Sequence, residues 1–138
     1  MRSIMAFVLL GVLLLIAHSP VLGATEAPDC LIDLGPCTSI AAGRQVVFDI
    51  SPKPVRFMKE LTFTVRTKGG KTAPTVLLDL SMPGMYMGIN QVMLKRTADG
   101  SYSGKGIIPR CPSGKKLWQA EVTLPGAGKA SYTFNVSH

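Results

Sequence analysis

The hydrophobic and polar positions of this chain alternate with a period of two over most of its length. In residues 60–67, for example, Leu61, Phe63 and Val65 share one face of an extended segment. Such alternation is typical of a β-strand with one buried face, because successive side chains point to opposite sides of a sheet. Turn residues separate the segments that follow this pattern, which are residues 46–50, 60–67, 75–80, 91–96, 102–108, 116–124 and 130–136.

Short strands at a spacing of roughly 8–12 residues are typical of an antiparallel β-sandwich. The pair Asp99-Gly100 adds a tight hairpin signal between two of them. We therefore predict an all-β fold, in which residues 44–138 form a single seven-stranded antiparallel Ig-like β-sandwich. The Cys–Trp–Cys pattern of antibody domains is absent from the sequence, so "Ig-like" describes the architecture alone.

The N-terminus follows a different pattern. Arg2 precedes an apolar run over residues 4–17, which is shorter than the approximately 20 residues that a membrane-spanning helix needs. Residues 1–23 are thus predicted to be a secretory signal peptide, cleaved before Ala24 or, as a second option, near Ala27. The alternative is an uncleaved membrane anchor. Either way we expect export across the inner membrane, and cleavage would release a periplasmic protein.

Export places the cysteines in an oxidising compartment, where disulfides form and persist. Cys30 and Cys37 both lie in residues 24–43, which we predict to be an N-terminal arm with a local disulfide. Either of them could instead pair with Cys111, because the sequence does not fix the pairing. One disulfide leaves one thiol over, and that thiol needs an explanation.

Charge and composition argue against several functions. The chain has 15 basic and 8 acidic residues, but the basic residues are spread and aromatic residues are few, so we predict no nucleic-acid partner. The sequence favours a soluble cationic surface over a nucleic-acid-binding or membrane-binding patch, and we expect a monomer or weak oligomer. Beyond the signal peptide the only histidine is His138, and the carboxylates show no paired spacing. Triad, Cys-His and His-based zinc sites are therefore disfavoured, and we predict that the protein is not an enzyme.

Residues 81–90 interrupt the strand pattern and concentrate sulfur. Met82, Met85 and Met87 are three of the seven methionines of the chain, and Pro83-Gly84 is a turn signal within the group. Thioethers are soft ligands that suit Cu(I) better than a hard cation. This bend is therefore the candidate metal-binding segment.

Antiparallel pairing brings the remaining thiol to the same place. If residues 91–96 and 102–108 form a hairpin, the bend before the first strand and the bend after the second lie at one end of it. Cys111 lies in that second bend. We predict a Cu(I) site formed by Met82, Met85, Met87 and Cys111, which would also account for a free thiol in an oxidising compartment.

Packing offers a different explanation for the same residues. Methionine fills gaps in cores, as we expect of Met58 and Met93, and a methionine-rich bend also suits an adaptable protein-binding surface. Cys111 could be a small buried hydrophobe or half of a disulfide. Trp118 is predicted to anchor the core.

The order of motifs resembles the YtkA-like / FixH-like group of exported β-sandwich domains. Met-Pro-Gly-Met-x-Met at residues 82–87, Asp-Gly-x-Tyr-x-Gly at residues 99–104 and the segment of residues 113–122 carry this resemblance. It implies a role in copper handling, in the assembly of copper-containing oxidases or in metal efflux, with the methionines of the bend as the matching positions. The chain departs from the family pattern at Cys111, where the family tends to have a methionine. FixH-type proteins also keep a membrane anchor, which this chain is predicted to lose.

The sequence thus predicts an extracytoplasmic copper-binding protein, a Cu(I) carrier or chaperone whose partner is a membrane oxidase or a metal-efflux component. The alternative is a protein-interaction module without metal that assists the assembly of such a complex.

Overall fold

The computed structural model describes residues 26–138, so the predicted signal peptide lies outside the described residues. Residues 26–138 contain strands and no helix, and hence no helix long and apolar enough to cross a membrane. The strands are β1 (Cys37–Ala41), β2 (Arg44–Ser51), β3 (Leu61–Thr67), β4 (Thr75–Ser81), β5 (Gln91–Arg96), β6 (Tyr102–Gly106), β7 (Leu117–Leu124) and β8 (Gly128–Asn135).

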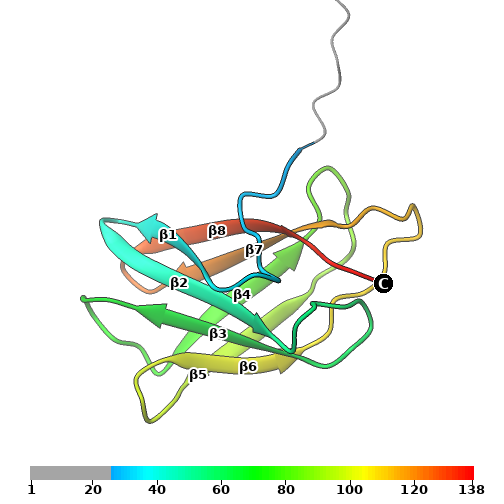
Figure 1. Ribbon diagram of the computed structural model, residues 1–138. Helices are drawn as coiled ribbons and strands as arrows, with labels where there is room; N and C mark the ends of the chain where they lie inside the picture. The colour runs from blue at the N-terminus through cyan, green and yellow to red at the C-terminus, as the bar shows by residue number, and fades with distance from the viewer. Residues whose placement is uncertain (1–25) are drawn as a thin grey trace, which may run out of the picture.

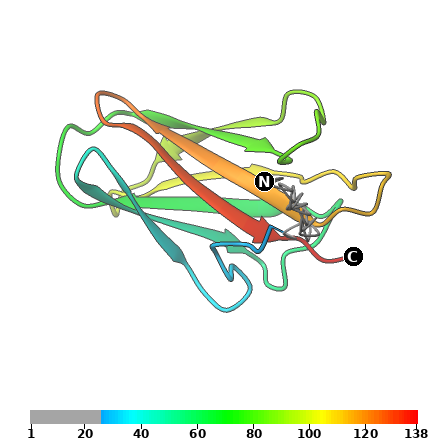
Figure 2. The same cartoon turned by 90° about the horizontal axis from the view of Figure 1, so that it is seen from above.

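All eight strands belong to one sheet in the order β1-β2-β3-β6-β5-β4-β7-β8, and every neighbouring pair is antiparallel. The two outer strands, β1 and β8, lie beside each other, so the sheet curls into a nearly closed, barrel-like shape (Figure 1, Figure 2). The predicted all-β antiparallel class is confirmed. The seven-stranded sandwich is corrected to eight strands in one nearly closed sheet.

Strand β1 accounts for the difference in strand number. It lies within the predicted N-terminal arm and pairs with β2 from Cys37, opposite Phe48, to Ala41, opposite Arg44. Its burial alternates, but the apolar Ile40 lies on the exposed face, while Cys37 and Ser39 on the inner face are half-buried. The strand therefore forms through pairing with β2, and alternation of apolar side chains does not reveal it.

The core is formed by the apolar faces that the alternation predicts. Phe48 of β2 stacks on Phe63 of β3 and Tyr132 of β8, with ring centroids 6.5 Å and 5.1 Å apart. Trp118 is fully buried, which confirms its predicted place in the core. Burying a large apolar side chain contributes about 1.5–3 kcal/mol, and these residues are among the largest fully buried side chains of the core.

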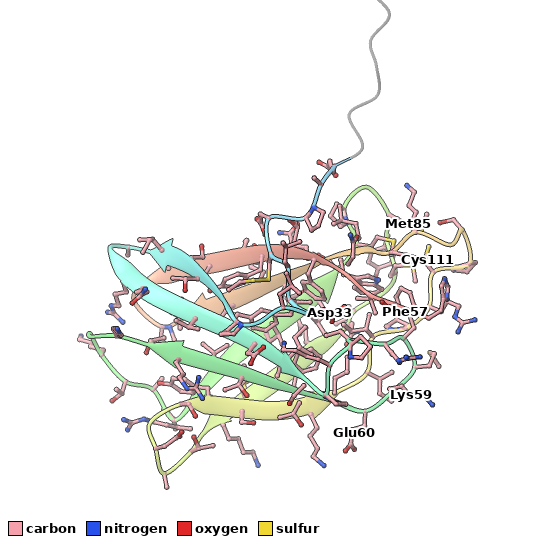
Figure 3. The ribbon with its side chains drawn as sticks, in the orientation of Figure 1. Asp33, Phe57, Lys59, Glu60, Met85 and Cys111 are labelled. Atoms are coloured by element: carbon pink, nitrogen blue, oxygen red, sulfur yellow. A yellow bond between two sulfur atoms is a disulfide. The ribbon has the colours of Figure 1, made fainter. Side chains whose placement is uncertain are left out.

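The segment before β1 is fastened to β8. Asp29 exchanges two hydrogen bonds with Thr133, and the Cys30 N–H donates to the Thr133 carbonyl at 2.9 Å. A disulfide joins Cys30 to Cys37, visible as the yellow bond in Figure 3, and Cys111 is free. The sequence left three pairings open, and the structure contains the local one. Residues 26–138 contain eight paired strands, a disulfide and a shared hydrophobic core, which are the features of a domain that folds by itself.

Candidate metal site

Two bends meet at one end of the barrel. The first bend, residues 82–90, joins β4 to β5, and the second, residues 107–116, joins β6 to β7. The Asn90 side chain donates from Nδ2 to the Ile107 carbonyl at 3.1 Å, which links the bases of the two bends. The predicted juxtaposition is therefore confirmed. We call this end of the barrel, with the 82–90 and 107–116 bends and the neighbouring residues 52–60, the bend end (Figure 1).

The closest sulfur contact at the bend end joins the two bends. The Cys111 thiol lies 3.3 Å from the Met85 Sδ, and Figure 3 shows the two side chains side by side. Cys111 is only 2 % exposed, whereas Met85 is half-buried at the edge of the core. The thiol is therefore shielded from solvent by the methionine bend, and movement of the Met85 side chain would open a path to it.

Ser113 lowers the pKa of the Cys111 thiol. The Ser113 hydroxyl lies 2.9 Å from the Cys111 Sγ. This hydrogen bond is the main cause that lowers the pKa of the Cys111 thiol, and burial partly opposes it. The backbone N–H groups of Ser113 and Lys115, and the Lys115 charge, lower the pKa further. Because the thiolate is the metal-binding form, this environment favours ligand chemistry at Cys111.

The other two methionines of the bend have a larger packing role. Met82 is buried in the core, and its carbonyl accepts the Met85 N–H at 3.1 Å to close the Pro83-Gly84 turn. Met87 is half-buried against the same core. The sulfur contact thus joins Met85 and Cys111, while the Met82 and Met87 side chains of the same bend pack against the core.

The Cys111 thiol and the Met85 thioether are the kinds of ligand that a soft metal prefers, and a small movement of the Met85 side chain would give them the spacing that a metal needs. With metal–sulfur bonds of about 2.3 Å, as in zinc thiolates, two ligands at a tetrahedral angle are roughly 3.8 Å apart. The observed 3.3 Å is a direct contact, so Met85 would have to turn slightly away from Cys111. Residues 26–138 contain no cluster of three or more His, Cys, Asp or Glu residues able to hold a metal, so the candidate depends on methionine.

Sequence reasoning missed several features of this end. The sequence did not predict that Ser113 would contact Cys111. A turn over residues 111–114, closed by a hydrogen bond of 3.0 Å from the Gly114 N–H to the Cys111 carbonyl, brings the two side chains together, and the Pro112-Ser113-Gly114 segment was the available signal of that turn. Met58 and Met93 were expected to pack, yet both are exposed. They lie near a loop apex and on the outer face of β5, where no other layer covers them.

We compared the chain with protein-family models, curated proteins and solved structures, and none of the three comparisons found a match. The arguments about function therefore depend on the residues and their geometry.

Proposed function

We propose that this protein is an extracytoplasmic copper-binding protein, a carrier or chaperone for Cu(I), with Cys111 and Met85 as its central ligands. The observation that carries the proposal is the contact of 3.3 Å between a free, buried thiol and a thioether from a separate bend. A thiolate and a thioether are the soft ligands that select Cu(I). Met82 and Met87 complete the proposed site when the 82–90 bend rearranges.

The distribution of the three cysteines supports this role. Cys30 and Cys37 are joined in a disulfide, as expected of an exported protein, while Cys111 remains a thiol. Burial beneath Met85 protects that thiol from disulfide exchange with other proteins. A carrier needs such a group, because the thiolate must stay reduced in an oxidising compartment until metal arrives.

Copper binding to Cys111 would displace the thiol proton, and a neighbouring side chain makes this easier. Ser113 hydrogen-bonds the Cys111 sulfur and lowers the pKa of the thiol, so less free energy is needed to release the proton at neutral pH. Release to a membrane oxidase or efflux component would begin with the half-buried Met85 swinging outward. We propose these recipients, and kinship with the YtkA-like / FixH-like domains, together with the copper role.

A competition titration against a chromogenic Cu(I) chelator tests the proposal, with the chain of residues 24–138 whose Cys30–Cys37 disulfide is intact and whose Cys111 thiol is free. We expect one Cu(I) per chain. Met85→Leu, which nearly conserves volume, and Cys111→Ala should each weaken binding at least tenfold, equivalent to about 1.4 kcal/mol. Affinity should also fall as the pH drops below the pKa of Cys111, because protons then compete for the thiolate.

Met93→Leu is the matched control, because Met93 is 54 % exposed on β5 and lies outside the bends. It should bind copper like the unmodified chain. Equal affinities for Met85→Leu and Met93→Leu in folded proteins would refute the assignment of Met85. A chain that never competes with the chelator would refute the copper role itself.

A further inference from the structure

The bend end also exposes apolar side chains of a kind that a soluble surface rarely presents together. Tyr86 and Ile89, in the 82–90 bend, are 85 % and 83 % exposed. Ile107 is also exposed, at the start of the 107–116 bend, where its carbonyl accepts the Asn90 side chain of the first bend. Single exposed apolar residues are ordinary, but a group on adjoining bends marks an interaction surface. None of these side chains takes part in the proposed metal site.

The neighbouring 107–116 bend carries positive charge. Arg110, Lys115 and Lys116 are all exposed on the 107–116 bend, and none of them forms a salt bridge within residues 26–138. Lys115 and Lys116 line one wall of an open cleft of about 900 Å³ whose other walls include Met82 and Pro83. The cations and the methionine bend therefore face a shared surface.

The opposite end of the barrel lacks this combination. Lys68 and Lys71 are exposed there, in the loop between β3 and β4 (Figure 1), but the large exposed apolar residue near that end is the isolated Ile40. Cationic charge alone therefore does not distinguish the two ends. The distinguishing feature of the bend end is that exposed aromatic and aliphatic side chains in the 82–90 bend occur together with cations in the 107–116 bend that are unpaired within residues 26–138.

The path of the chain indicates what this surface meets. Glu26, Ala27 and Pro28 line the same cleft as Lys115 and Lys116, so the chain enters the fold at the bend end. Eight residues separate the end of the apolar run of residues 4–17 from Glu26, a distance that spans at most about 30 Å. While that run is in a bilayer, during export or as a retained anchor, the bend end is the part of the domain held closest to the membrane.

We propose that the bend end docks on a membrane surface rich in anionic phospholipid. Tyr86 and Ile89 enter the headgroup region, where tyrosine is favoured, while Lys115 and Lys116 lie against lipid phosphates. Insertion is shallow, because the backbone of residues 86–90 is not part of a ladder and its polar groups need water. Docking of this kind goes beyond copper binding and does not depend on it.

Vesicle co-sedimentation with the metal-free chain of residues 24–138 tests the docking. Vesicles of phosphatidylcholine with a quarter phosphatidylglycerol should bind the protein, and vesicles of phosphatidylcholine alone should bind it at least about tenfold less. Lys115→Glu with Lys116→Glu, and separately Tyr86→Ser with Ile89→Ser, should each lower the partition coefficient by about tenfold. All four positions are exposed, so the variants should unfold at the same temperature as the unmodified chain.

Two control variants at the far end carry matched changes. Lys68→Glu with Lys71→Glu makes the same change of charge, and Ile40→Ser removes an exposed apolar side chain. Both should retain binding within about twofold of the unmodified chain. The docking proposal is overturned if anionic vesicles do not bind the chain, if the far-end charge variant loses as much as the bend-end one, or if the Tyr86/Ile89 variant binds normally. In those cases a protein partner becomes the better explanation of this surface.

Discussion

At the scale of single residues, the sequence predicted which sulfur atoms gather at the bend end but not what each one does. Residue type and hairpin topology were enough to bring Met85 and Cys111 together. They did not predict that Ser113 bonds the thiol or that Met82 is buried in the core, because both depend on side-chain packing across two bends. Contacts between individual side chains of two bends belong to the tertiary structure, and the alternation of apolar and polar residues along the chain does not reveal them.

Tyr132 provides a test of burial at this scale. Its hydroxyl donates to the Val46 carbonyl at 2.7 Å, and burial raises the pKa of Tyr132 to about 12. An unfolded tyrosine ionises near pH 10, so the folded state holds this proton more tightly. The stabilisation is fully present below pH 10 and is lost as the pH rises toward 12.

We expect the tyrosinate absorbance of the folded protein to include a step near pH 12, which Tyr132→Phe should lack. The variant should also be less stable by about 1 kcal/mol at pH 7, for the lost hydrogen bond, and should lose less stability than the unmodified chain between pH 10 and pH 12. An absorbance change near pH 12 that is the same in Tyr132→Phe and in the unmodified chain would contradict the buried environment.

At the scale of strands, alternation predicted β2 to β8 within a few residues at each end, and β5 at both ends. The pattern succeeded because each of these strands has one face in a single shared core. It missed β1, whose apolar Ile40 points outward. That strand is defined by its hydrogen bonds to β2 and its place beside β8, neither of which requires an apolar face.

The glycines of β6 give a prediction at this scale. A Cβ added at Gly104 would lie 2.8 Å from the Leu94 Cδ2 and 3.0 Å from the Val92 Cγ1, both side chains of β5. Leu94 is fully buried and cannot move away easily. Gly104→Ala should therefore destabilise the protein by about 1–3 kcal/mol in urea unfolding, although alanine is otherwise the better strand residue.

Ser103→Ala, the neighbouring position on the other face of β6, serves as the control and should change the stability by less than about 1 kcal/mol. Combining Gly104→Ala with Leu94→Val should recover part of the loss, because the shorter side chain makes room. A Gly104→Ala protein as stable as the unmodified chain would show that β5 does not press on β6 in this way.

At the scale of the whole molecule, alternation of apolar and polar residues does not distinguish a sandwich from a nearly closed barrel, because both bury one face of every strand. The closure depends on β1 lying beside β8, reinforced by the Asp29–Thr133 bonds and the Cys30–Cys37 disulfide that fasten the preceding segment. The result is a nearly closed barrel with its sulfur contact, basic loops and chain entry all at the bend end. Metal binding and membrane docking are thus proposed for one end of a single scaffold.

X-ray absorption at the copper edge tests the copper proposal most directly, on the chain of residues 24–138 with its Cys30–Cys37 disulfide intact and one equivalent of Cu(I) bound. We predict a first coordination shell of sulfur alone, and its loss in Cys111→Ala. Met93→Leu should leave the spectrum unchanged. A shell containing nitrogen or oxygen, such as the His138 imidazole would supply, or copper that is removed by desalting, would contradict the proposed site.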